Sequence, residues 1–277
     1  MNRALCLLVV CMLAVSDSWA DEPNDSSQGA TATSTQRTMR DLIDEAVDWY
    51  QVCPSATSDA PMKRLVVLRY VNHVRESSSG VVVLWLHEGR PAAAATVFDW
   101  YNQICHAFVS LSRDNKMIAR DAQAVVWHCT TPGIEFRSVP DGPPPSETDA
   151  ARLRQMKALS RLFSSTLLGW KSDLSDREEL RLLTQPLYRY EGTGPEFLDG
   201  AVFAFAQGTD PETLLVLEAV RVDDRYQWQY GFARQTSGGL DGRYRGNVVW
   251  TAEKDPRGDR SDPYTTLTKP ILEPVKH

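Results

Sequence analysis

The sequence predicts an α+β fold in which two related halves, each a helix with an antiparallel sheet, form a large antiparallel sheet or half-barrel. The main observation is an internal repeat. A shift of 120 positions, from Arg69 to Arg189, brings many segments into register. The matched positions include Arg69–Tyr70 with Arg189–Tyr190, Gly80 with Gly200, Val82 with Val202 and Pro91 with Pro211. This constant shift predicts an internal duplication.

A second observation is that apolar residues recur at helical spacing ahead of each copy. Such stripes are typical of a helix that packs one face on a core. The first stripe is Met39, Leu42, Ile43, Ala46, Val47 and Tyr50, and the second is Leu159, Leu162, Phe163, Leu167 and Trp170, interrupted by Thr166. Chance agreement is the alternative, because any two α+β segments share spacings. A shift that persists through helix, strand and turn favours duplication.

The N-terminus has the pattern of a secretory signal peptide over residues 1–20. An apolar run follows a charged start, and Ser18 and Ala20 are the small residues that precede a cleavage site, here before Asp21. The run is shorter than the span of about 20 residues needed to cross a bilayer. We therefore expect export, to the periplasm or the exterior, with no transmembrane anchor after cleavage. Residues 21–35 are polar and predict a disordered tether.

Residues 36–140 predict the first half. Thr38 and Asp41 match a capping box that opens a helix. The segment 92–101 fits a helix by its alanines, but the matching segment 214–220 favours a strand, and we predict a strand. Further strands are expected at 64–71, 80–86, 106–112 and 124–127, with an edge strand at 134–139.

A proline-rich segment at 141–147 predicts an extended spacer between the halves. The second half covers residues 148–253. Ser146 or Thr148 is expected to cap a long helix that continues to Trp170.

The remaining segment, 254–277, contains the polar string DPRGDRSDP and predicts an extended C-terminal arm. The formal net charge is −6 without a basic cluster, so nucleic acid is not an expected partner. The chain has no nucleophile elbow, zinc-protease helix, phosphate loop or dinucleotide-binding glycine motif. We therefore predict no catalytic residue, no metal and no cofactor.

Cys53, Cys105 and Cys129 follow the predicted cleavage site. The predicted strands place Cys105 beside Cys129, so these two are expected to form a disulfide in an oxidising compartment. Three buried thiols are the alternative. His106 and His128 adjoin these cysteines, which would suit zinc. Because neighbouring strand residues point to opposite faces, we favour structural roles for both histidines.

The repeat also supplies the candidate binding residues. Two repeated arginines that face a central groove could clamp a carboxylate or sulfate. Pairing of each arginine with a nearby acidic residue is the commoner arrangement at a strand end. The repeated tryptophans could line a binding surface or serve as core residues. The candidates are Arg69, Tyr70, Arg189, Tyr190, Trp127 and Trp250.

Three strings, RLRQMKALSRLF (152–163), LRLLTQPLYRY (180–190) and DGAVFAFAQGTDPE (199–212), are similar to segments of an uncharacterised family of secreted bacterial proteins of the planctomycete type. The resemblance extends from the first helix to Trp250. It implies export and a discrete fold, and it carries no activity, ligand or site residue.

The sequence therefore favours an exported, non-enzymatic binding or envelope-associated module, whose partner is an envelope protein or a small anionic ligand. A hydrolase or ligand-processing enzyme with its site in the cleft between the halves is the alternative. An enzyme should show converging polar side chains and a titratable group with a shifted pKa in that cleft. A binding module should show an exposed apolar or aromatic patch.

Overall fold

The structure is a computed structural model that describes residues 37–58, 60–72, 77–113, 117–122, 124–169, 176–255 and 258–272. These residues belong to one unit, Gln36–His277. The predicted signal peptide and tether lie outside the described residues.

The described chain is predominantly β, with about 60% of its residues in strands and 9% in helices. The predicted α+β class, with two balanced helix-plus-sheet halves, is therefore wrong, whereas the antiparallel sheets are confirmed. The physical reason is that two segments expected outside the sheets, 163–168 as helix and 264–270 as part of an extended arm, pair with neighbouring strands instead, so few described residues remain helical.

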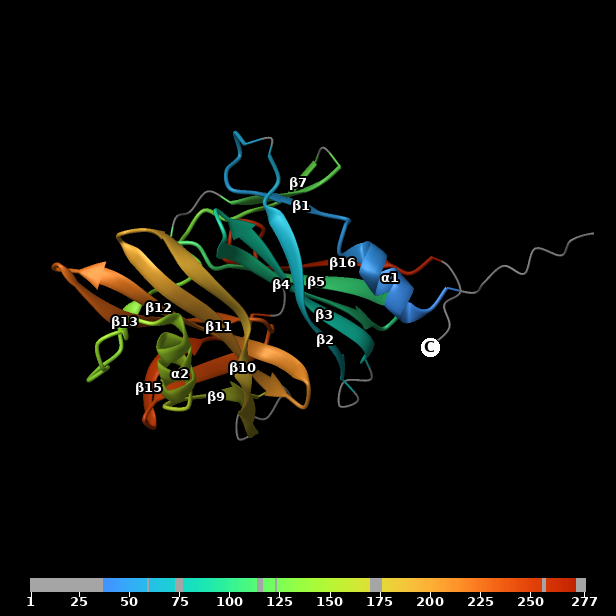
Figure 1. The fold of residues 1–277 in the computed structure, drawn as a ribbon. Helices are drawn as coiled ribbons and strands as arrows, with labels where there is room; N and C mark the ends of the chain where they lie inside the picture. Colours follow the sequence, from blue (N-terminus) through green and yellow to red (C-terminus); the bar gives the residue numbers. More distant parts are fainter. Residues whose placement is uncertain are drawn as a thin grey trace, which may run out of the picture. The chain divides into compact units, whose positions relative to one another are not determined.

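Three antiparallel sheets make up the fold (Figure 1). Their strand orders are β16-β5-β4-β3-β2, β15-β14-β9-β10-β11-β12-β13-β8 and β1-β6-β7. The strands are β1 (Gln51–Cys53), β2 (Lys63–Asn72), β3 (Ser77–His87), β4 (Arg90–Trp100), β5 (Gln103–Ser110), β6 (Ile118–Asp121), β7 (Ala124–His128), β8 (Arg137–Ser138), β9 (Phe163–Leu168), β10 (Arg177–Gly194), β11 (Phe197–Gln207), β12 (Asp210–Val222), β13 (Arg225–Arg234), β14 (Gly239–Tyr244), β15 (Asn247–Ala252) and β16 (Tyr264–Pro270).

The helix α1 (Met39–Ala46) begins at the predicted capping box. The Thr38 hydroxyl accepts the main-chain N–H of Asp41, and the Asp41 carboxylate accepts the main-chain N–H of Thr38. The helix α2 (Asp149–Ser160) begins at Thr148, one of the two predicted caps.

The predicted continuation of the second helix to Trp170 is wrong, because α2 ends at Ser160 and β9 follows it. Phe163, Ser165 and Leu167 are the buried residues of β9, and they alternate with less buried ones. Residues four apart lie on one face of a helix and also on one face of a strand. The spacing from Phe163 to Leu167 therefore fits a helix and a strand equally well. Trp170 itself lies outside the described residues.

The order of strands recurs along the chain. β3 and β11 begin at Ser77 and Phe197, and β4 and β12 begin at Arg90 and Asp210, which is the shift seen in the sequence. β1 pairs with β6 of one hairpin, and β9 pairs with β14 of the other. The strand that follows each series joins the sheet built by the other series: β8 pairs with β13, and β16 pairs with β5 (Figure 1).

Two expectations change as a result of this exchange. The edge strand predicted at 134–139 is limited to the two residues of β8. The segment 254–277, expected as an extended arm, instead supplies β16, whose Tyr264 and Pro270 lie opposite Val109 and Gln103 of β5. The signal for this strand is weak, because the string YTTLTKP (264–270) contains few large apolar residues.

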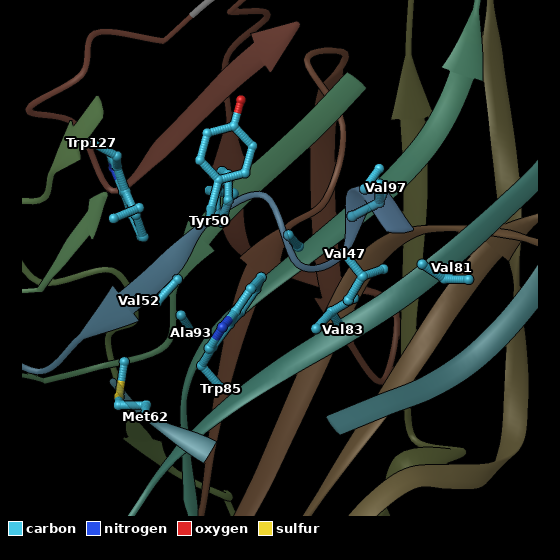
Figure 2. Packing of buried hydrophobic residues seen from close by; sticks show 14 of the residues in the cluster. Val47, Tyr50, Val52, Met62, Val81, Val83, Trp85, Ala93, Val97 and Trp127 are labelled. Carbon is cyan, nitrogen blue, oxygen red and sulfur yellow. The ribbon is translucent and has the colours of Figure 1, made fainter. Parts of the chain in front are cut away.

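The buried residues form three layers. One layer fills the space between the five-stranded and eight-stranded sheets and includes Leu84, Ala107, Val202 and Leu214. A second covers the opposite face of the five-stranded sheet, where α1, β1 and the β6–β7 hairpin pack on it. Figure 2 shows part of this second layer, with Val47, Tyr50, Val52, Met62, Val81, Val83, Trp85, Ala93, Val97 and Trp127 labelled. The third covers the opposite face of the eight-stranded sheet and includes residues of α2, β9 and β14.

Candidate functional site

A pocket of about 960 Å³ surrounds the edge strand β16. All six residues from Tyr264 to Lys269 line it. Because successive strand residues point to opposite faces, the pocket follows both faces of β16. We call the part on the side of the eight-stranded sheet the inner arm, and the part on the side of Tyr50 the outer arm.

The inner wall of the inner arm is one face of three adjacent strands. Thr96 of β4 and Thr266 of β16 lie opposite Ala107 of β5, which belongs to the core between the two large sheets. The next row toward the end of the strands is Phe98, Cys105 and Thr268, followed by Trp100 and Gln103. This wall therefore combines hydroxyl groups with aromatic rings.

The opposite wall comes from the eight-stranded sheet, at the start of β12 and just after β13. Asp210, Gln235, Thr236 and Ser237 line it. The Asp210 carboxylate accepts a hydrogen bond of 3.0 Å from the side-chain amide of Asn72. Gln235 is only 3% exposed, and neither atom of its side-chain amide forms a hydrogen bond with any described residue.

An aromatic pair stands at the rim of the inner arm. Trp100 is 46% exposed and Tyr101 is 78% exposed, and their ring centroids lie 5.0 Å apart. They occupy the turn between β4 and β5, where Tyr101 and Asn102 both have positive φ. The main-chain N–H of Ile271 donates to the carbonyl of Asn102 at 2.9 Å, which fixes the end of β16 to this turn.

The outer arm contains an ion pair beside an aromatic ring. The Lys269 ammonium lies 2.6 Å from the Asp121 carboxylate and 5.2 Å from the centre of the Tyr50 ring. Burial, and secondarily the charge of Asp121, raises the pKa of Tyr50 to about 12, so its hydroxyl is protonated at neutral pH. Lys269 is therefore already engaged within the protein.

The nucleophile and base of a hydrolase are not assembled in this pocket among the described residues. Burial, with a smaller contribution from the charge of Asp99, raises the pKa of the Cys105 thiol to about 12, so it is not a thiolate. His106 faces the other side of β5, and burial lowers its pKa to about 4. In the described ranges, no group of three or more His, Cys, Asp or Glu side chains could hold a metal ion.

The six residues suggested by the repeat lie away from this pocket. Arg69 forms an ion pair with Asp44 of α1. Arg189 donates to the Asp199 carboxylate at 2.6 and 3.1 Å. Each arginine therefore has its own acidic partner, and the two do not form a common clamp.

The repeated tyrosines pack over the repeated glycines. Tyr70 lies opposite Gly80 and Tyr190 lies opposite Gly200. A Cβ atom at these glycines would lie 2.4 Å from the Tyr70 ring and 2.6 Å from the Tyr190 ring. The recurrence of these residues in the sequence is thus explained by packing.

The repeated tryptophans also make internal contacts. Trp127 is fully buried, and its indole N–H donates to the carbonyl of Asp262 at 2.8 Å. Trp250 is partly buried and stacks on Phe232, with 5.5 Å between the ring centroids.

The three cysteines are buried free thiols. The predicted neighbourhood of Cys105 and Cys129 is not found, because β5 and β7 belong to different sheets. The Cys129 thiol instead donates to the carbonyl of Thr131 at 3.0 Å.

A second polar cluster lies between the two large sheets, around one buried carboxylate. Glu218 is fully buried and accepts hydrogen bonds from the Arg90 guanidinium at 2.8 and 2.5 Å, from Arg113 at 3.0 Å and from the Tyr190 hydroxyl at 2.7 Å. Both arginines also lie over the Phe136 ring, with Arg113 3.9 Å from its centre. This arrangement joins the sheets and leaves the carboxylate fully satisfied.

The pocket residues were missed in the sequence because its walls come from distant segments. Asp210 begins β12 directly after a turn, and Gln235 belongs to no motif. The string Trp100–Tyr101–Asn102 could have indicated the pocket. A polar turn beside two exposed aromatic residues is unusual on a surface that binds no ligand or partner.

None of the helices in the described ranges has the length and apolar character required to cross a membrane. The chain matches no protein-family model, no curated protein and no solved structure in comparisons with each.

Proposed function

We propose that this chain is an exported, non-enzymatic binding protein that takes a small molecule into the inner arm of the pocket. The observation that carries the proposal is the pocket of about 960 Å³ with the exposed pair Trp100–Tyr101 at its rim. Export rests on the N-terminal sequence pattern.

The size and lining of the pocket support a ligand site. Small-molecule sites have volumes of roughly 300–1,000 Å³ and combine apolar walls with a few polar groups that fix orientation. Here the aromatic rings of Phe98 and Trp100 supply apolar surface, and Asp210, Gln235 and Thr268 supply polar groups. The exposed aromatic pair is the patch expected of a binding module.

The chemistry of the pocket favours binding over hydrolysis. A hydrolytic site of the serine or cysteine type needs a nucleophile within hydrogen-bond reach of a base. Cys105 is held as a neutral thiol, and His106 lies on the other face of its strand. The described pocket residues thus offer polar contacts without an activated nucleophile.

The proposal is tested with the neutral fluorescent probe N-phenyl-1-naphthylamine, which reports apolar pockets. Thr268 is an exposed residue that lines the inner arm, so Thr268→Trp should obstruct it while the protein still folds. Thr251→Trp is the matched control, because Thr251 is exposed on β15 and does not line the pocket. We expect one saturable probe site, weakened at least tenfold by Thr268→Trp and unchanged by Thr251→Trp. Equal binding in all three proteins would contradict the proposal.

A further inference from the structure

We infer that the inner arm binds a neutral polyhydroxylated molecule of the size of a mono- or disaccharide, oriented by Gln235 and stacked on Trp100. This inference rests on the proposed function, since it names the ligand class of the same pocket. It is carried by three observations: an unpartnered buried amide, a wall of hydroxyl groups whose described residues include no cation, and an exposed aromatic ring.

The first observation is the side-chain amide of Gln235. It is buried in the pocket wall, and its nitrogen and oxygen form no hydrogen bond with the described residues. Leaving a buried polar group unsatisfied costs about 1–3 kcal/mol. A primary amide has both donors and an acceptor, and a hydroxyl group can also do both. A ligand rich in hydroxyl groups can therefore satisfy both ends of this amide once the side chain turns toward the inner arm.

The second observation is the polarity of the surrounding wall. Thr96, Thr236, Ser237, Thr266 and Thr268 line the inner arm and carry hydroxyl groups that can donate or accept. Asp210 adds a carboxylate acceptor, which matches a ligand O–H donor.

The charge of this wall separates a neutral ligand from an anionic one. Among the described residues that line the pocket, the cationic ones are Arg260 and Lys269, and both belong to the outer arm. Lys269 is paired with Asp121, and Arg260 acts electrostatically on Tyr50. The described residues of the inner arm therefore offer hydroxyl, amide and carboxylate groups without a cation to pair with an anion, which suits a neutral molecule.

The third observation is the position of Trp100. It lies on the same strand face as Thr96 and Phe98, two rows beyond the buried end of the pocket, and its ring is about half exposed. A large flat ring beside hydroxyl groups suits a ligand that has an apolar C–H face and a polar edge, as a pyranose does.

The test uses calorimetric titration with D-glucose, D-galactose, D-mannose, N-acetyl-D-glucosamine, cellobiose and maltose, with choline as a cationic probe. Gln235→Leu removes both amide atoms at nearly constant size, and it should preserve folding because it removes an unsatisfied group. Gln227→Leu, at the other end of β13, is the matched control. We expect at least one sugar to bind, with affinity reduced at least tenfold by Gln235→Leu and within twofold of wild type in Gln227→Leu.

The outcomes separate this inference from the proposed function. If N-phenyl-1-naphthylamine binds in the pocket but no sugar does, or if choline binds instead, the ligand class is wrong and the binding function stands. Sugar binding that is unaffected by Gln235→Leu overturns the role of the amide. If neither the fluorescent probe nor any sugar binds, both proposals fail.

Discussion

At the residue scale, His106 shows how burial controls charge. Its Nε2 atom lies 2.8 Å from the carbonyl of Ala46, and its ring packs edge-on against Tyr50. Burial, with a smaller effect of the Lys269 charge, lowers the His106 pKa from 6.5 to about 4, although Ala46 and Asp121 act in the opposite direction. The imidazole is therefore neutral in the folded protein at physiological pH.

This lowered pKa predicts a loss of stability on mild acidification. Between pH 6.5 and about 4, the unfolded state binds a proton at His106 that the folded state does not. The stability that the folded protein owes to a neutral His106 is therefore fully present above pH 6.5. It is lost as the pH falls, and the free energy of unfolding decreases by an amount on the order of 3 kcal/mol at pH 4. Urea unfolding across this range should show the decline, and His106→Gln should reduce its slope. An identical slope in the two proteins would contradict this assignment.

The Glu218 cluster supports a second prediction at this scale. Glu218→Ala leaves the buried Tyr190 hydroxyl and two arginines without their shared acceptor, so the free energy of unfolding should fall by about 3 kcal/mol. Glu135→Ala is the control, because its ion pair with Arg137 is exposed and should contribute at most about 1 kcal/mol. Equal losses in chemical denaturation would show that the cluster is not a stabilising junction.

At the element scale, the cross-strand pairs of tyrosine and glycine position neighbouring strands. Gly200→Ala places a Cβ atom 2.6 Å from the Tyr190 ring and should reduce the free energy of unfolding by roughly 1–3 kcal/mol, because the ring must move. Gly194→Ala is the control, since nothing lies within 4 Å of its Cβ position. Thermal and urea unfolding of the two variants measure the difference. A Gly200→Ala protein as stable as the control would contradict the packing argument.

Local signals predicted most of the elements correctly, and long-range contacts explain the failures. The capping box at Thr38 and the strand at 92–101 follow from short-range chemistry and from the matching segment, and both are confirmed. The segment 163–168 was predicted as helix because its apolar spacing fits both geometries, and pairing with β10 and β14 on both sides determines the outcome. The candidate site could not be predicted, because Asp210 and Gln235 meet β4 and β5 only after the sheets pack.

At the scale of the whole molecule, β16 has two roles. It completes the five-stranded sheet, and it separates the inner and outer arms of the pocket. Truncation after Lys254 removes β16 and leaves β5 as an unpaired edge. We expect the truncated protein to lose the site for N-phenyl-1-naphthylamine and to self-associate, because an unpaired apolar edge can pair with another chain. Size-exclusion chromatography and probe titration measure both effects.

A matched truncation after Leu272 retains all of β16. This protein should remain unchanged in association state and in probe binding. If the protein that ends at Lys254 stays monomeric and binds the probe normally, β16 is not required to form the pocket.

The exchange of β8 and β16 between the two strand series also sets the order in which the protein can be completed. Tyr264 must find Val109 across more than half of the given sequence, so the five-stranded sheet lacks its edge strand until the segment 264–270 has been made. Contacts of such large sequence separation slow folding, and an unfinished sheet edge is prone to aggregation. The five-stranded sheet can therefore be completed only after the strands of both series have been synthesised. Under the proposed export, this delay would keep the polypeptide incompletely folded for translocation and leave assembly to its destination.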